Sequence, residues 1–267
     1  LQMEAELKQA PENQALSVVY QPILSLADQK ILSCEALARW QHPERGMIPP
    51  SEFIRLAEEG GLIAALDMWV LRQACKQTRE WQKTIPGAAD LKVNVNFSDK
   101  HWAQTDLVDR ITGILQETGL VPGDLILEIT EKALAENRTL AAGLPGELQA
   151  LGVQLQVDDF GKGQSSLELL ACLPLDALKI DLSFVSNMQE DATQMKIIQT
   201  IIQLAHNLGM KVTAVGVETP AQRDRLEASG CDFIQGYLVA VPQGCQQMTD
   251  LLRLAFANPT QNDKERA

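Results

Sequence analysis

The adjacent acids Asp158 and Asp159 are the residues of this sequence most suited to chemistry. They directly follow a strand-like run at residues 153–157, and two neighbouring carboxylates repel each other unless a cation lies beside them. Glu128 poses a similar problem, because a carboxylate inside an apolar strand is costly unless it is paired or neutralised. Lys179, in another apolar run, offers one cation. Such a set of oxygen donors also suits a hard divalent metal ion.

Short β-branched or apolar runs alternate with longer amphipathic stretches along the chain. The runs predict eight strands, at about residues 16–20, 31–37, 91–96, 125–129, 153–157, 177–180, 211–215 and near Phe233. The amphipathic stretches predict helices at residues 66–82, 107–117, 140–151, 165–173, 195–208 and 221–229. This alternation predicts an α/β fold, a (β/α)8 TIM-like barrel. Residues 21–30 are too few for a helical crossover, so we expect an irregular or antiparallel first strand.

Polar residues end seven of the eight predicted strands. They are Glu35 at the second strand, Asn96 at the third, Glu128 at the fourth, Asp158 and Asp159 at the fifth, Lys179 and Asp181 at the sixth, Glu218 at the seventh and Gln235 at the eighth. In a parallel barrel these strand ends form one mouth, where active sites lie. Two Mg²⁺ or Mn²⁺ ions held there about 3.5–4 Å apart could activate water against a phosphodiester.

Simpler interpretations of some of these residues stay open. Asn94 and Asn96 alternate with valines and could be hydrogen-bonded fillers of a barrel layer. Lys179 could simply pair with Asp181.

The composition excludes several classes of function. Asp plus Glu number 35 against 23 Lys plus Arg, and the net charge of −12 disfavours duplex nucleic acid and anionic lipid as partners. No apolar stretch approaches the roughly 20 residues of a membrane span, so we expect no membrane insertion. The five cysteines are widely spaced, which favours a reducing, cytoplasmic location. The three histidines are scattered, so any metal ion must be held by oxygen.

The chain is expected to have three segments. Residues 1–15 predict a connector helix, residues 16–257 the barrel domain and residues 258–267 a flexible polar tail. The sequence starts within a polar helical pattern and without an initiator Met, which predicts a partner domain upstream.

Eight ordered motifs resemble those of the EAL family of cyclic di-GMP phosphodiesterases, from about Ser17 to Pro242. They are Tyr20-Gln21-Pro22, Glu35-Ala36-Leu37-Ala38-Arg39-Trp40, Val95-Asn96-Phe97-Ser98, Leu127-Glu128-Ile129-Thr130-Glu131, Asp158-Asp159-Phe160-Gly161, Leu178-Lys179-Ile180-Asp181, Gly216-Val217-Glu218-Thr219 and Gln235-Gly236-Tyr237. The resemblance implies hydrolysis of cyclic di-GMP to linear pGpG with two Mg²⁺ or Mn²⁺ ions. It also implies a homodimer and an upstream GGDEF or sensory domain.

The same resemblance implies roles for individual residues. Glu35, Asn96, Glu128 and Asp158 would bind the first metal ion, and Asp158 and Asp159 the second. The catalytic group would comprise Lys179 at the attacking water, Glu131 supporting the loop after the fifth strand, and Glu218. Ligand contacts or the lining of the site would come from Gln21, Leu37, Arg39, Asp181 and Gln235.

The sequence departs from the family pattern near the second metal position. The family has Ala-Glu-Gly-Val-Glu after the seventh strand, and here Val215 replaces the first glutamate, a ligand of the second metal ion. Lys162 and Gln164 also stand where the family usually has Thr and Tyr. We therefore expect strongly weakened phosphodiesterase chemistry, because a lost direct ligand should exceed the roughly 10- to 100-fold effect of outer-shell changes.

Two alternatives remain beside this interpretation. One is a catalytically inactive cyclic di-GMP receptor or regulatory module. The other is a glycosidase barrel with Glu128 and Glu218 as acid and nucleophile, although aromatic residues are only 4% of the chain and leave few sugar platforms.

Overall fold

The computed structural model describes residues 2–98, 100–101, 106–136, 143–162, 167–189 and 191–257. The strands are β1 (Leu16–Ser25), β2 (Ile31–His42), β3 (Gly46–Ile48), β4 (Lys92–Asn96), β5 (Leu125–Thr130), β6 (Gln154–Phe160), β7 (Ala177–Ile180), β8 (Lys211–Val215) and β9 (Phe233–Gln235). The helices are α1 (Gln2–Gln9), α2 (Pro50–Glu59), α3 (Ile63–Thr84), α4 (Leu107–Thr118), the 3-10 helix η2 (Pro122–Asp124), α5 (Glu131–Glu136), α6 (Leu144–Leu151), α7 (Leu167–Cys172), α8 (Leu182–Asn187), α9 (Ala192–Asn207), α10 (Pro220–Ala228) and α11 (Cys245–Ala257). Gln164 and the predicted tail lie outside the described residues.

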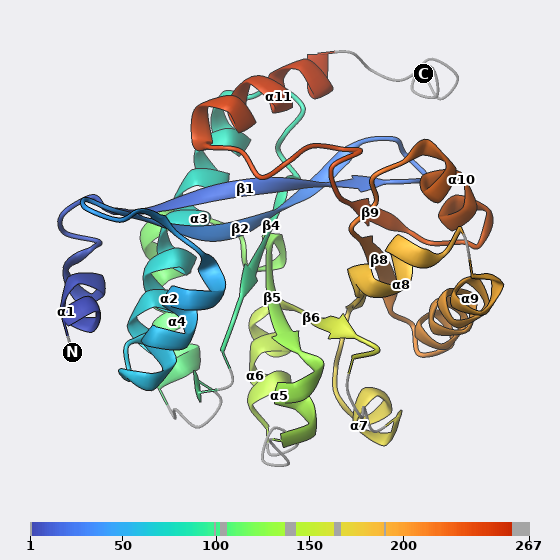
Figure 1. Cartoon of the computed structure of the whole chain (residues 1–267), viewed down its shortest axis with the longest axis horizontal. Coiled ribbons are helices and arrows are strands. Elements are labelled where there is room, and N and C mark those ends of the chain that lie inside the picture. The colour runs from blue at the N-terminus through green and yellow to red at the C-terminus, as the bar shows by residue number, and fades with distance from the viewer. Residues whose placement is uncertain are drawn as a thin grey trace.

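Eight of the strands close into a barrel around which the helices are arranged (Figure 1). Strands β2, β4, β5, β6, β7, β8 and β9 are successive parallel neighbours. Strand β1 closes the barrel by pairing antiparallel with both β2 and β9. The predicted (β/α)8 TIM-like barrel with an antiparallel first strand is therefore confirmed. Strand β3 was not predicted; it pairs with the last residues of β2 and extends the sheet there.

The short link between β1 and β2 explains the antiparallel pairing. The backbone N–H of Ser25 donates to the Lys30 carbonyl at 2.8 Å, and the Asp28 N–H donates to Ser25 Oγ at 3.2 Å. Gln29 takes a left-handed φ of 53° within this turn. The chain therefore reverses within a few residues, and no helix can carry it across the barrel to a parallel position.

The predicted helices correspond to α3, α4, α6, α7, α9 and α10, and the predicted connector contains α1. The predicted helix starts at residues 140 and 165 lie outside the described residues. Helices α2, α5, α8 and α11 are missing from the prediction. The α2 sequence starts with Pro50, which is typical of a loop but is also favoured in the first turn of a helix. Helices α5 and α8 span only 6 residues each. Helix α11 buries only Met248 and Leu252, too narrow a stripe to stand out in the sequence.

Strand register places the mouth residues beside one another. Asn96 lies opposite Glu128 and Thr130 lies opposite Asp158. Val215 lies opposite Gln235 at the ends of β8 and β9. None of the helices within the described residues combines the length and apolarity needed to cross a bilayer.

Candidate active site

Lys179 lies between two glutamates at the barrel mouth. Its Nζ is 2.9 Å from Glu35 Oε2 and 2.5 Å from Glu128 Oε1. All three side chains are buried, and Lys179 and Glu128 are each only 1% exposed. Lys179 does not pair with Asp181, the simpler interpretation left open above, because Asp181 pairs with Lys162 instead. The structure thus brings together residues from β2, β5 and β7. Glu35 does not end its strand as predicted, because β2 continues to His42.

This cluster contains two carboxyl groups and one ammonium group. Burial opposes the charge of Lys179, but Glu128 and Glu35 outweigh it and raise the Lys179 pKa, so the ammonium stays protonated. Burial also opposes ionisation of Glu35, yet Lys179 and Gln235 lower its pKa. Burial and the charge of Glu35 raise the pKa of Glu128 despite Lys179. One ammonium does not compensate these carboxylates, so the cluster favours a further cation.

Amide side chains fix the orientation of Glu35. Asn96 Nδ2 donates to Glu35 Oε1 at 2.6 Å, and Gln235 Nε2 donates to Glu35 Oε2 at 2.6 Å. Gln235 Nε2 also lies 3.1 Å from Gln21 Oε1, which accepts from it. The structure therefore gathers Gln21, Asn96 and Gln235, three predicted site residues, around one carboxylate.

A second amide layer lies on the amino-terminal side of Glu128. Asn94 Nδ2 donates to Glu128 Oε1 at 2.8 Å and to Gln156 Oε1 at 2.7 Å. Gln156 Nε2 donates in turn to Thr213 Oγ1 at 3.3 Å. From the sequence, Asn94 is a possible hydrogen-bonded filler and not a predicted site residue. The available signal was its alternation with valines two residues before Asn96.

The Asp158-Asp159 doublet directs its carboxylates to different surroundings. Burial and Glu35 raise the pKa of Asp158 against the opposing effect of Lys179, and its Oδ1 accepts the Asp159 N–H at 2.8 Å. Asp159 has a left-handed φ of 57°, an uncommon conformation for a residue other than glycine. Its side chain is 47% exposed and pairs with Lys162 at 2.9 Å.

Asp181 uses both carboxylate oxygens inside the protein. Its Oδ1 accepts the Ser183 N–H at 2.9 Å and caps α8, and its Oδ2 lies 2.8 Å from Lys162 Nζ. Burial opposes ionisation of Asp181, but hydrogen bonds from Lys162 and Ser183 lower its pKa to about 2. Its predicted contact with a ligand stays a prediction.

The other two residues of the predicted catalytic group lie in different environments. Glu131 is buried, and its Oε2 accepts the Gly161 N–H at 2.8 Å. It therefore contacts the loop after β6, the loop that the resemblance assigned to it. Glu218 is exposed near the start of α10, where Gln222 Oε1 accepts its backbone N–H at 2.8 Å. Its catalytic role stays a prediction.

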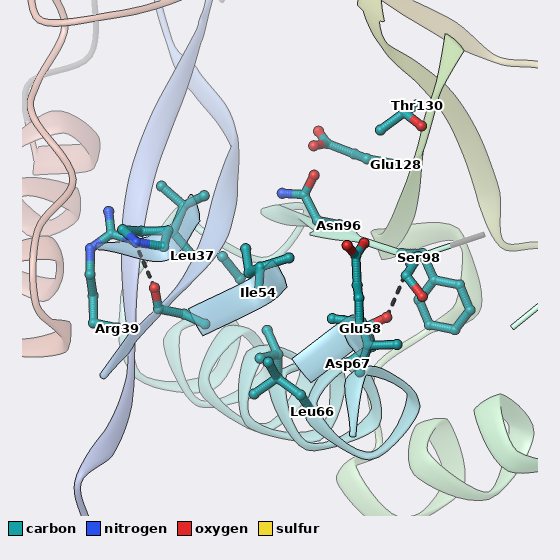
Figure 2. Close-up of a pocket in the computed structure, with 16 residues that line it drawn as sticks. Leu37, Arg39, Ile54, Glu58, Leu66, Asp67, Asn96, Ser98, Glu128 and Thr130 are labelled. Atoms are coloured by element: carbon teal, nitrogen blue, oxygen red, sulfur yellow. Dashed lines mark hydrogen bonds between the residues drawn. The ribbon is translucent and has the colours of Figure 1, made fainter. Parts of the chain in front are cut away.

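A pocket of about 320 Å³ opens beside the cluster (Figure 2). In this view Asn96 and Glu128 lie on one side and Leu37 and Arg39 on the other, with Ile54 of α2 between them. Burial lowers the pKa of Arg39 in spite of the charge of Glu35. Arg39 Nη1 donates to the carbonyl of the preceding residue at 2.8 Å. The pocket thus combines an apolar wall, a cation and the acidic cluster.

The donor atoms of the cluster are of the chemical kind that binds one divalent metal ion. The strand ends supply carboxylate and amide oxygens, which are hard ligands suited to Mg²⁺ or Mn²⁺. Glu128 Oε2 is buried and has no hydrogen-bond partner among the described residues, so it is an acceptor that a cation would satisfy. Within the same residues no group of three or more His, Cys, Asp or Glu is arranged to hold a metal ion, and Lys179 stands between Glu35 and Glu128.

The fit to a second metal ion is poor. Besides Asp158, the predicted ligand is Asp159, whose Oδ1 is paired with Lys162. Val215, at the end of β8, has a hydrocarbon side chain and supplies no oxygen. The residues present therefore do not form a second site of the kind that the resemblance implied.

Comparison with known proteins gives several close relatives. The chain is 44% identical over 253 residues to the cyclic di-GMP phosphodiesterase NbdA of Pseudomonas aeruginosa, covering 95% of this chain and 32% of that protein. It is 38% identical over 248 residues to the bifunctional diguanylate cyclase/cyclic di-GMP phosphodiesterase MucR of the same species, covering 93% of this chain and 36% of that protein. The chain thus spans about a third of the length of these curated relatives.

A solved structure has the same fold. The PaMucR phosphodiesterase in complex with c-di-GMP superposes with a TM-score of 0.87 at 38% identity, covering 93% of this chain and 100% of that one. The family profile of the EAL domain matches residues 4–242. This match spans most of the barrel and all the motifs described above, and the chain therefore belongs to the EAL domain family.

Proposed function

We propose that the barrel mouth binds cyclic di-GMP and hydrolyses it to linear pGpG with the help of a bound divalent metal ion, at a strongly reduced rate. The observation that carries this proposal is the buried Glu35–Lys179–Glu128 cluster beside the pocket that contains Arg39. The relatives NbdA and MucR, both named as cyclic di-GMP phosphodiesterases, support the choice of substrate.

The pocket residues match the two chemical parts of this substrate. Arg39 offers a guanidinium to a phosphate, for which its fork of donors is well suited. Leu37 and Ile54 offer an apolar wall to a nucleobase. An anionic substrate can enter this acidic protein because cations at the mouth, Arg39 and the metal ion among them, offset the carboxylates.

The cluster supplies the groups that a hydrolysis needs. Glu35, Asn96, Glu128 and Asp158 would hold the metal ion, which would lower the pKa of bound water and offset charge on the phosphate. Hydrolysis joins a water oxygen to phosphorus, and the ribose oxygen leaves with a proton. Lys179 stays protonated and can orient the water or donate to the phosphate as negative charge develops. The amides of Asn96 and Gln235 keep Glu35 in place for this role.

The reduced rate follows from the second metal position. Two metal ions can stabilise both the attacking and the leaving oxygen of a phosphodiester, whereas one ion stabilises fewer of the developing charges. Val215 adds no ligand there, and Asp159 is engaged with Lys162. The same observation favours a second candidate function, an inactive receptor that binds cyclic di-GMP without turnover. The glycosidase alternative has no support from the EAL family match.

Further features of the whole protein remain proposals. We propose a homodimer, a cytoplasmic location and fusion to an upstream GGDEF or sensory domain. Two observations support the fusion. MucR is named as bifunctional, and this chain covers only about a third of the length of MucR.

The test is to incubate the purified chain with cyclic di-GMP and Mn²⁺ or Mg²⁺ and to follow pGpG by chromatography. Val215→Glu is run in parallel, and binding of cyclic di-GMP is measured by calorimetry. Slow hydrolysis that rises in Val215→Glu supports the proposal. Binding without any hydrolysis selects the receptor function, and rapid hydrolysis by the unchanged chain shows that the second metal argument is wrong. No binding rejects both functions.

A further inference from the structure

Lys162 bridges two carboxylates at the ends of neighbouring strands. Its Nζ lies 2.9 Å from Oδ1 of Asp159, the second-last residue of β6, and 2.8 Å from Oδ2 of Asp181, which follows β7. The Lys162 side chain is half exposed, whereas the Asp181 side chain is 2% exposed. Lys162 is therefore the cation that compensates a buried carboxylate, and it engages Asp159 at the same time.

The backbone on both sides holds this bridge in place. Asp159 has a left-handed φ of 57°, and its side chain is half exposed where it meets Lys162. Asp181 is fixed through its other oxygen, which caps α8 at Ser183. An ion pair between a cation and two carboxylates that are already fixed loses less side-chain entropy than an isolated surface pair. The cation is therefore held more firmly.

A metal ion bound at Asp159 Oδ1 would have to displace the Lys162 ammonium, which lies 2.9 Å from that oxygen. The displaced ammonium would leave Asp181 buried and without its cation, and an uncompensated buried charge is costly. The Val215 side chain has no oxygen that could bind the metal ion and so offset the cost of displacing Lys162. Both features act in the same direction, against a second divalent ion.

We propose that Lys162 is the resident cation of the Asp159–Asp181 pair and excludes a divalent ion from Asp159, so that the mouth loads one metal ion rather than two. This inference rests on the proposed function for the first metal site. Lys162 is a positioning residue in this scheme, since it acts through Asp159 and Asp181.

The experiment is a titration of the metal-free protein with Mn²⁺ alone, followed by electron paramagnetic resonance of the free ion. Lys162→Gln removes the charge but keeps a hydrogen-bond donor for Asp181. Lys162→Arg keeps the charge, and Lys196→Gln removes a charge from an exposed residue of α9. Thermal unfolding of each variant verifies that it is folded.

We expect one Mn²⁺ per chain for the unchanged protein, for Lys162→Arg and for Lys196→Gln. In Lys162→Gln the affinity for a second Mn²⁺ should be about tenfold higher than in the unchanged protein. Removing one positive charge near a partly exposed site has an effect of about this size. The double variant Lys162→Gln/Val215→Glu should have a still higher affinity for the second Mn²⁺. Its affinity should also exceed that of Val215→Glu alone.

Four results would overturn the inference. They are an unchanged Mn²⁺ titration in Lys162→Gln, an equal gain in Lys196→Gln, a gain in Lys162→Arg, and two ions or none in the unchanged protein. Cyclic di-GMP binding is measured separately on the same samples. If no variant binds cyclic di-GMP, the proposed function fails, while the Mn²⁺ titration still decides the role of Lys162.

Discussion

The Lys179 ammonium lies 2.5 Å from Glu128 Oε1, with both side chains enclosed in the barrel. Burying such a pair costs desolvation energy that often cancels the attraction between the charges. The pair is therefore a poor source of stability, and its place at the mouth points to chemistry instead. Glu128 Oε1 also accepts from Asn94, which leaves Oε2 of the same carboxylate for another partner.

Replacing Lys179 tests its part in hydrolysis. Lys179→Met keeps an unbranched side chain but removes the charge, and we expect pGpG formation to fall by about 100-fold or more. The unfolding free energy of the metal-free protein should fall by about 3 kcal/mol, because the ammonium that compensates Glu35 and Glu128 is lost. Chromatography and urea unfolding measure the two effects. Lys196→Met, at an exposed lysine of α9, should change neither, and full activity in Lys179→Met would reject the assigned role.

Asn94 is predicted to position Glu128 for the metal ion. Asn94→Leu keeps the branching and the number of side-chain heavy atoms but removes the hydrogen bonds to Glu128 and Gln156. We expect Mn²⁺ affinity to fall by about 10- to 100-fold, as for other residues that orient metal ligands. The unfolding free energy should fall by about 1–3 kcal/mol, since Gln156 Oε1 loses its donor. The matched control is Asn187→Leu, at an exposed asparagine of α8. Unchanged Mn²⁺ affinity in Asn94→Leu would make Asn94 a filler only.

The sequence predicted the barrel and the cluster because both depend on local signals. A carboxylate such as Glu128 within an apolar strand already indicates a buried acid that needs a partner. The barrel fold then determines which strand ends lie at the same mouth. The antiparallel β1 followed from the length of a single loop. In each case a few neighbouring residues carried the information.

Other parts of the site depend on geometry that spacing does not reveal. The bridge from Lys162 to Asp181 accompanies a left-handed φ at Asp159, and the residue types of the doublet specify neither feature. The contact of Asn94 with Glu128 depends on the orientation of two side chains from different strands. Helix α2, which lines the pocket with Ile54, was missed because Pro50 at its start is equally typical of a loop.

Replacing Gly161 by a residue with a side chain is predicted to destabilise the protein. Its φ is 103°, and an added Cβ would lie only 2.4 Å from the Phe184 ring. Gly209 has a φ of 79° but nothing within 4 Å of an added Cβ. Gly209→Ala should therefore cost only the backbone strain, about 1–2 kcal/mol, whereas Gly161→Ala should cost at least about 1 kcal/mol more. Urea unfolding measures both, and equal costs would show that Phe184 moves aside freely.

The carboxylate of Asp232 makes stability dependent on pH at the β8–β9 side of the barrel. Burial opposes its ionisation, but hydrogen bonds from Lys211 and His206 lower its pKa. A carboxyl whose folded pKa is lowered stabilises the protein above its unfolded pKa of about 3.9, and this contribution is lost as the pH falls through the folded pKa. Asp232→Asn should therefore cost about 1–2 kcal/mol of unfolding free energy at pH 7. In urea unfolding the cost should shrink steadily below about pH 4. Glu227→Gln, at an exposed acid of α10, is the control, and a cost for Asp232→Asn that stays constant down to acid pH would show that shape rather than charge at this position matters.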